Sequence, residues 1–310
     1  MRILVSADDL GLTKGITDGI LLAHGEGVLS STSVLAGGEA FDYAMEQWRS
    51  RPTLALTAHL NLMEGPSSAP AREVDLLVDE RGEMALSFID LLRLSLRLRG
   101  AVRERLRGQI RDELDAQIRA VAAAAGPGWK PRVDGHQHYH MIPIVLEALL
   151  ELHERWNFSW VRVTEEPFFL ARPLGPALPN YLGPNLAKHG ILKVLSRRAK
   201  RELARKGIPH CRWFVGLLFS GQMMIDPIRS AIAHLKGLPA SALGDDDIVE
   251  ILLHPGRAGA GESGRWGTRH DLRDYYVSPW RDRERDTLCS PEFRSAVTPY
   301  LFSPAAGAAT

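Results

Sequence analysis

The sequence predicts one α/β domain built on a parallel, barrel-like sheet. Three observations support this fold class. Strand-like segments alternate with helix-like segments over residues 2–62, which is the order of a parallel sheet covered by helices. Polar clusters follow several of these strands, as they do at the functional edge of parallel sheets. The 310 residues contain no linker-like break and no fixed-period repeat, so we expect a single domain over 1–310.

The first five segments alternate regularly between strand and helix. Short apolar or β-branched runs predict strands, and apolar residues at three- and four-residue spacing predict helices. On this basis we expect a strand at 2–7, a helix at 12–27, a strand at 28–35, a helix at 41–48 and a strand at 54–62.

Further elements follow with longer insertions between them. We expect a helix at 87–125, a strand at 132–140, a helix at 142–156, a strand at 159–163, a basic helix at 192–206 and a last strand at 247–253. Residues 66–125 and 167–246 are interpreted as elaborations of the core. The five prolines of residues 167–190 predict a rim loop. The tail at 257–310 carries no diagnostic pattern.

Composition excludes several classes of protein. The 38 basic and 37 acidic side chains give a formal net charge of +1, so no overall charge favours nucleic acid. Two cysteines cannot form a disulfide framework or a cysteine-rich zinc cluster. No run of about 18 apolar residues predicts a membrane span, and the first residues show no signal-peptide pattern. We therefore expect a cytoplasmic protein, with an ordinary core formed from its 45% hydrophobic residues.

Polar clusters lie where the predicted strands end. Because the carboxyl ends of parallel strands meet at one face, two carboxylates and up to five imidazoles would share one pocket. Borderline divalent metals bind imidazole together with carboxylate oxygen, so the clusters predict a metal site. The residues concerned are Asp8, Asp9, His59, Asp134, His136, His138, His140 and His254.

Strand geometry adds an expectation for the histidine-rich cluster. Side chains alternate between the two faces of a strand. If 132–140 is a regular strand, then His136, His138 and His140 project to one side of the sheet, together with Asp134.

The two adjacent aspartates need a different geometry. In a regular strand Asp8 and Asp9 would point to opposite faces, so they can serve one site only if the chain turns there. Gly11 is consistent with such a turn. We infer that one carboxylate is a metal ligand and that its neighbour reaches the bound water from another side.

Each cluster also has a simpler explanation when it is considered alone. A single histidine in a strand is more often a hydrogen-bonded structural residue than a ligand. An Asp-Asp pair before a helix is often an N-cap with a favourable dipole contact. The simpler explanation must, however, place four polar clusters at four strand ends by chance, and the joint pattern therefore favours the metal site.

Five short motifs carry a family resemblance. They are SADDLGL at Ser6–Leu12, STS at Ser31–Ser33, HLNLMEG at His59–Gly65, DGHQHYH at Asp134–His140 and HPG at His254–Gly256. In this order they resemble the YdjC-like carbohydrate deacetylases. The usual opening of that family is Asn-Ala-Asp-Asp-Phe-Gly, so this chain differs at Ser6 and Leu10, and Met63 replaces a frequent threonine. The resemblance covers residues 1–166 and returns at 247–256.

The resemblance implies a distorted, incomplete (β/α) barrel of the TIM type, with extra rim loops and helices. It also implies a metal-dependent hydrolase that removes the N-acetyl group from an amino sugar, such as an N-acetylglucosamine-type saccharide or glycoconjugate. Carried over by motif, the metal ligands would be Asp9, His59 and His136. Asp8 would be the base acting on a metal-bound water, and His254 the general acid. One divalent ion is expected, either Mg²⁺ or Zn²⁺, with Mn²⁺ and Co²⁺ as alternatives.

Six further residues are predicted to contact the substrate: Asn61, Glu64, His138, His140, Arg162 and Trp266. His138 and His140 are also alternatives to His254 as the general acid. Trp266 offers a ring for stacking on a sugar, although it could equally pack the tail against the barrel. The expected partner is a small carbohydrate or glycoconjugate, without nucleic acid and without an integral membrane segment. A homodimer is an open alternative.

Other interpretations of the same residues also need stating. The basic side chains of 192–206 would suit a phosphate-bearing carrier or an anionic membrane surface, but a solvated helix face is the simpler reading. Two histidines and one carboxylate also describe the iron oxygenase triad, although an adjacent second aspartate has no obvious use there. An inactive sugar-binding or regulatory homologue is a further alternative, against which the intact Asp8, Asp9, His59 and His136 argue.

Overall fold

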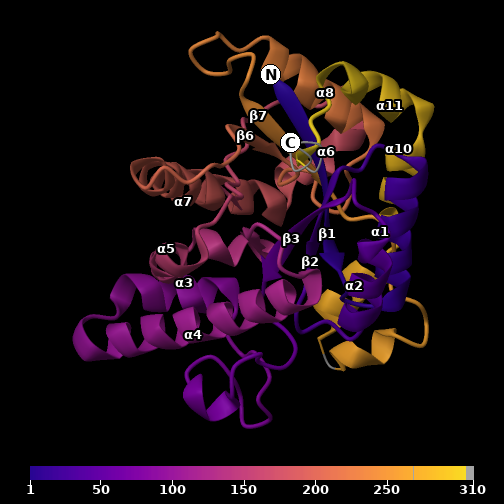
Figure 1. Cartoon of the computed structure of the whole chain (residues 1–310). Helices are drawn as coiled ribbons and strands as arrows, with labels where there is room; N and C mark the ends of the chain where they lie inside the picture. The colour runs from indigo at the N-terminus through magenta and orange to yellow at the C-terminus, as the bar shows by residue number, and fades with distance from the viewer. Residues whose placement is uncertain (268, 305–310) are drawn as a thin grey trace.

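Seven parallel strands form one sheet that curls into a half-barrel (Figure 1). The computed structural model describes residues 1–267 and 269–304. The strand order is β5-β4-β3-β2-β1-β7-β6, and within the described residues the edge strands β5 and β6 share no ladder. The predicted incomplete barrel is therefore confirmed. The strands are β1 (Arg2–Leu10), β2 (Ser31–Val34), β3 (Ala55–Leu60), β4 (Arg132–Gly135), β5 (Trp160–Val161), β6 (Trp213–Val215) and β7 (Ile248–Leu253).

Helices connect the strands and cover the sheet. In Figure 1, α3, α4 and α5 lie on one flank of the sheet, and α1, α2 and α10 lie on the other. Within residues 1–267 and 269–304, the short 3-10 helices η1 to η4 are Ala71–Glu73, His136–Met141, Ser263–Trp266 and Thr298–Tyr300. The α-helices are α1 (Lys14–Glu26), α2 (Phe41–Arg49), α3 (Phe88–Arg97), α4 (Gly100–Ala125), α5 (Pro143–Trp156), α6 (Leu174–Leu182), α7 (Pro184–Arg205), α8 (Ile225–Lys236), α9 (His270–Tyr276), α10 (Trp280–Cys289) and α11 (Pro291–Val297).

Strand β1 is the centre of the sheet. It pairs with β2 on one side and with β7 on the other, and every residue from Ile3 to Leu10 is buried. Burying a large apolar side chain contributes about 1.5–3 kcal/mol, so the Ile-Leu-Val run holds this strand in the middle of the core. Asp8 and Asp9 are consequently fixed at the carboxyl edge of the sheet.

The predicted strand at 132–140 is wrong beyond Gly135. The chain turns into the 3-10 helix η2, because Gln137 and His138 adopt left-handed backbone angles, with φ of 46° and 65°. A Cβ at Gly135 would lie 2.6 Å from Nδ1 of His140, so the reversal needs glycine there. The expected alternation of the three histidines on one strand face therefore does not occur.

Three other sequence expectations also need correction. The predicted rim loop at 167–190 is wrong beyond Pro173, because α6 begins at Leu174 and α7 at Pro184. Pro184 lies in the first turn of its helix, where a proline costs no hydrogen bond. The predicted helix at 87–125 is divided into α3 and α4, with Gly100 at a φ of 58°. Strand β6, which is only three residues long, and helix α8 were not predicted.

Helix α1 contacts the loop that follows β7, and this contact leads to a testable prediction. A Cβ at Gly19 would overlap the Cα of Gly256 and lie 2.9 Å from its nitrogen. Gly19→Ala should therefore destabilise the fold by about 1–3 kcal/mol, as overpacking does, and displace the loop that carries His254. Gly25→Ala in the same helix meets no atom within 4 Å and should stabilise by up to about 1 kcal/mol. Urea denaturation of both variants tests this, and equal stabilities would contradict the close approach.

Candidate active site

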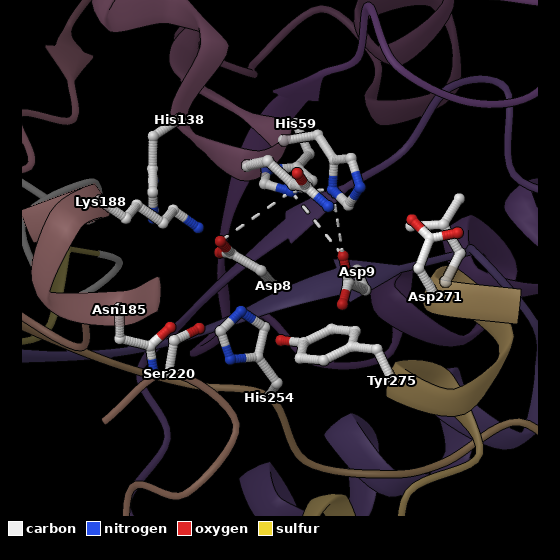
Figure 2. Close-up of a pocket in the computed structure, with 13 residues that line it drawn as sticks. Asp8, Asp9, His59, His138, Asn185, Lys188, Ser220, His254, Asp271 and Tyr275 are labelled. Atoms are coloured by element: carbon white, nitrogen blue, oxygen red, sulfur yellow. Dashed lines mark hydrogen bonds and ion pairs between the residues drawn. The ribbon is translucent and has the colours of Figure 1, made fainter. Parts of the chain in front are cut away.

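A cavity of about 290 Å³ opens at the carboxyl ends of the strands. Figure 2 shows the acidic and imidazole side chains converging on it from separate elements. Strand β1, strand β3, helix η2, helix α7, helix α9 and the loops after β6 and β7 all contribute side chains. The lining residues are Asp8, Asp9, His59, His136, Gln137, His138, Asn185, Lys188, Ser220, His254, Asp271, Leu272 and Tyr275.

Asp9, His59 and His136 form a buried group whose donor atoms could hold a metal ion. Nε2 of His59 lies 3.1 Å from Nδ1 of His136. Oδ1 of Asp9 lies 3.4 Å from that Nδ1 and 3.8 Å from the His59 Nε2. The structure thus brings together the three ligands that the motifs suggested.

The opposite nitrogen of each imidazole contacts a carboxylate. Nδ1 of His59 donates to Asp134 at 2.6 Å, and Nε2 of His136 lies 3.1 Å from Oε1 of Glu64. When these nitrogens carry the protons, the two remaining nitrogens present lone pairs to each other and to Asp9. Such converging acceptors suit a cation, and a carboxylate behind each imidazole is the usual arrangement of histidine metal ligands. The residues present therefore fit a divalent metal.

The charges around His136 also favour a cation at this position. Burial lowers the pKa of His136, but its hydrogen bonds to Asp9 and Glu64 and their charges outweigh this and raise the pKa to about 10. The cluster therefore strongly favours a positive charge at this point. Glu64 is itself held by Tyr276 at 2.7 Å and by the indole of Trp266 at 2.8 Å.

A local distortion of β1 lets both aspartates reach the cavity. The pairing of β1 with β2 shifts register between Ala7 and Leu10, and Asp9 has a φ of 75°. A bulge of this kind bends a strand and re-aims its side chains. The expected turn is therefore present, and it lies at Asp9 as well as at Gly11, whose φ is 82°.

Hydrogen bonds hold Asp8 in a fixed orientation beside the group formed by Asp9, His59 and His136. Arg162 donates to its two oxygens at 2.7 and 2.9 Å, and Ser33 donates at 2.6 Å. Burial alone would raise the pKa of Asp8, but the Arg162 and His59 charges hold that pKa well below its usual range. Asp8 is therefore an ionised carboxylate, with one oxygen 3.9 Å from Nε2 of His59.

A second group, Asp8, His59 and Asp134, also has donor atoms close enough for a metal. Arg162 contacts Oδ2 of Asp134 at 2.8 Å, in addition to its two contacts with Asp8. Its guanidinium already compensates the charges of both carboxylates, which leaves less attraction for a cation. The group that contains Asp9 is therefore the better candidate.

His254 lies across Asp8 and Asp9 from His59 (Figure 2). Its ring packs edge-on against Tyr275, with ring centroids 5.9 Å apart. Burial lowers the pKa of His254 to about 4 despite the nearby aspartates, so this imidazole is neutral near pH 7. Its Nδ1 has no hydrogen-bond partner among the described residues.

The structure places only one of the six predicted substrate contacts on the cavity wall, namely His138. His140 contacts the carbonyl of Arg162 at 3.0 Å and lies behind the site with that arginine. Asn61 orders its own loop by donating to the carbonyl of Glu64 at 2.6 Å. Trp266 is buried against Tyr276, with ring centroids 4.7 Å apart, and its indole packs behind Glu64.

Two residues of the C-terminal tail that hold the site in place, Arg281 and Glu284, were not predicted from the sequence. Arg281 in α10 is fully buried and donates to Oδ2 of Asp9 at 3.0 Å and to the carbonyl of Gly256 at 2.6 Å. Glu284, one turn later, accepts from the backbone N–H of Met223 at 2.9 Å and from that of His254. The sequence carries no signal for these two supports, because they depend on the packing of α10 against α1.

Helix α7 also supplies cavity residues that were not predicted, Asn185 and Lys188. Figure 2 shows the amino group of Lys188 directed toward Asp8. Within the described residues, no carboxylate oxygen lies within ion-pair distance of it. Burial lowers the pKa of Lys188 to about 8. The three-residue spacing of Asn185 and Lys188 would have indicated a shared helix face, had the helix been predicted to begin at Pro184.

None of the helices in the described part of the chain combines the length and the apolar character that a membrane span requires.

Comparisons with known proteins cover most of the chain. The family model described as YdjC-like protein matches residues 2–298. A carbohydrate deacetylase of Brevibacillus brevis is 33% identical over 171 residues, 54% of this chain and 62% of that protein, so the match spans less than two thirds of that relative. A human carbohydrate deacetylase is 30% identical over 297 residues, 88% of this chain and 84% of the relative.

The fold is similar to a solved structure as well. A protein of Enterococcus faecalis V583, proposed to cleave cellobiose phosphate, aligns with a TM-score of 0.68 at 22% identity. The alignment covers 99% of this chain and 98% of that one. At this identity the likeness establishes the half-barrel fold alone.

Proposed function

The chain belongs to the YdjC-like protein family, and from this premise we propose that it is a metal-dependent carbohydrate deacetylase that hydrolyses the N-acetyl group of an amino sugar. One observation carries the proposal. An ionised, arginine-held aspartate lies directly beside a buried carboxylate and two imidazoles whose free nitrogens converge. The curated relatives named above as carbohydrate deacetylases support it.

Asp9, His59 and His136 are the residues that would hold the metal. When bound there, a divalent cation would polarise the acetamide carbonyl and lower the pKa of a water molecule. Two imidazoles with one carboxylate suit Zn²⁺, Mn²⁺ or Co²⁺ better than Mg²⁺, which prefers oxygen ligands. Asp134 and Glu64 would keep both imidazoles in the required tautomer and orientation.

Asp8 would accept the proton of the attacking water. A general base must be unprotonated and must point at the proton it accepts. Arg162 meets both needs, because it keeps Asp8 ionised and fixes both carboxylate oxygens. Arg162 is therefore a positioning residue in this proposal and not a substrate contact.

His254 would protonate the leaving nitrogen from the opposite side of the cavity. Because its pKa is about 4, the free protein holds it neutral near pH 7. It can therefore deliver a proton only after it gains one during the reaction, for example the one that Asp8 removes from water. A His254→Ala variant with an unchanged rate would move this role to another residue.

The proposal is tested by measuring acetate release from a panel of N-acetyl sugars. The full chain would be treated with a chelator and then reloaded, without oxygen, with Zn²⁺, Mn²⁺, Co²⁺ or Mg²⁺. We expect loss of activity on chelation and recovery with at least one of these ions. Recovery with redox-inactive Zn²⁺ would exclude an oxygenase. Binding of the sugars without any acetate release would contradict the proposal and favour an inactive sugar-binding homologue.

Lys188 gives a separate prediction for this reaction. Its ammonium group reaches the cavity without a carboxylate partner in the described residues, so it is available to donate to a substrate oxygen. Removing a hydrogen bond from a charged donor costs about 1.5–3 kcal/mol, so Lys188→Met should lower kcat/KM by about 10- to 100-fold. Lys193→Met on the same helix, outside the cavity lining, is the matched control. Equal kcat/KM values for the two variants would rule out a contact between Lys188 and the substrate.

A further inference from the structure

Exposed apolar side chains concentrate in one part of the molecule, residues 168–201, which we call the α6–α7 segment. Fourteen large hydrophobic side chains are exposed among the described residues, and eight of them lie between 168 and 194. Scattered exposed leucines are ordinary, but such a concentration indicates an interaction surface. The eight are Phe168, Leu170, Leu174, Leu178, Leu182, Leu186, Ile191 and Val194.

The same segment is cationic. Residues 167–201 contain no aspartate or glutamate, although acidic and basic residues are balanced over the whole chain. Three of its basic side chains pair with acids from neighbouring elements, Arg197 and Lys200 with Glu165 and Arg198 with Glu147. The basic residues are Arg172, Lys188, Lys193, Arg197, Arg198, Lys200 and Arg201.

The apolar and basic side chains are ordered along the two helices. In α6, Leu174, Leu178 and Leu182 recur every four residues, which places them along one face. In α7 the exposed positions are apolar at Ile191 and Val194 and become basic beyond them. The most exposed members are Leu182 at 78%, at the end of α6, and Val194 at 68%. Apolar side chains followed by cations on a short helical hairpin are typical of interfacial, membrane-surface helices.

We infer that the α6–α7 segment docks the protein on the surface of an anionic lipid bilayer. Its apolar side chains would enter the boundary between headgroups and acyl chains. Its cations that neither line the cavity nor pair with an acid among the described residues, Arg172, Lys193 and Arg201, would meet the anionic headgroups. Charge decides between this occupant and a second copy of the chain. A symmetric dimer through the segment would bring two cationic, acid-free stretches together and would be opposed by their repulsion.

The location of the segment gives the docking a consequence for the cavity. Helix α7 carries Leu186 and Ile191 on the proposed docking surface, and it also carries Asn185 and Lys188 into the cavity lining. Docking would therefore hold the cavity close to the lipid surface. This mode is peripheral, and it does not require a membrane-spanning helix.

The test is co-sedimentation of the full chain with lipid vesicles. We expect at least tenfold stronger binding to vesicles with about 30% phosphatidylglycerol than to pure phosphatidylcholine vesicles, because only the former carry a negative surface potential. Raising the salt from about 0.1 to about 0.5 M should weaken the binding, because it shortens the screening length. Equal or undetectable binding to the two kinds of vesicle would overturn the proposal.

Two double variants probe the two parts of the surface. Leu182→Ser with Val194→Ser should reduce binding to the anionic vesicles at least tenfold, and Lys193→Glu with Arg201→Glu should do the same. The control is Leu96→Ser with Val102→Ser, which removes side chains of similar exposure, 56% and 57%, from α3 and α4 and should leave binding unchanged. Circular dichroism checks folding, and if the apolar variant does not fold, the charge-reversal variant decides. Light scattering gives the oligomeric state. If the wild type is a dimer and the apolar double variant is a monomer, the surface binds a second copy of the chain and not a membrane.

Discussion

Asp8→Asn is expected to lower kcat by about 10²- to 10⁴-fold while the protein keeps its bound metal. The range is the usual contribution of a positioned general base. The amide has nearly the same shape as the carboxylate, and an amide oxygen in the Oδ1 position can still accept from Ser33 and from Nη2 of Arg162. It cannot, however, accept the proton of a water molecule. Steady-state acetate release measures kcat, and metal analysis after dialysis measures the amount of bound metal.

The contrasting variants are Asp9→Ala, His59→Ala and His136→Ala. Each removes one of three converging donor atoms, so each should lose the metal on dialysis and lose activity with it. Asp18→Asn, at a surface position in α1 where the carboxylate contacts Lys14 and the hydroxyl of Tyr43, should change neither quantity. Full activity in Asp8→Asn would overturn the base assignment. Metal loss in that variant would instead make Asp8 a ligand.

Arg162→Met is expected to destabilise the fold by about 3–5 kcal/mol, the usual cost of leaving buried charges without their partner. The guanidinium lies 2.7 Å from Asp8, 2.8 Å from Asp134 and 2.8 Å from Glu250. All four side chains are buried, so solvent cannot replace the lost charge. Thermal and urea denaturation measure the loss, and activity should fall as well because Asp8 is no longer held.

The matched control for this variant is Arg197→Met. Arg197 also pairs with a glutamate, Glu165 at 3.0 Å, but its side chain is 55% exposed. Exposed ion pairs contribute about 0–1 kcal/mol, so this substitution should have a small effect. A loss below about 1 kcal/mol in Arg162→Met would mean that the three buried carboxylates do not depend on Arg162.

The strand ends were the part of the site that could be predicted from the sequence. Asp8, Asp9, His59 and His254 follow or end apolar strands, and a parallel sheet brings such ends together whatever connects them. His136 was placed correctly for a partly wrong reason, because the strand that was expected to carry it ends one residue earlier. Left-handed angles at a glutamine and a histidine leave no clear signal in the sequence.

The supports of the site could not be predicted in the same way. Arg281, Glu284 and Tyr275 lie on helices of a tail without diagnostic motifs, and their contacts depend on how α9 and α10 pack against the barrel. Arg162 was singled out, but its role follows from which carboxylates surround it. Such information exists only after the long-range packing is known.

The contact between Arg281 and Asp9 joins residues 272 positions apart. During synthesis, Asp9 therefore leaves the ribosome long before Arg281, whose positive charge compensates its carboxylate. A nascent or nicked chain that ends after β7 would contain Asp8, Asp9, His59, His136 and His254, yet it would bury Asp9 without this counter-charge and leave the His254 loop without Glu284. Catalytic competence should therefore appear only late in synthesis, which makes activity a sensitive indicator of an intact C-terminal region.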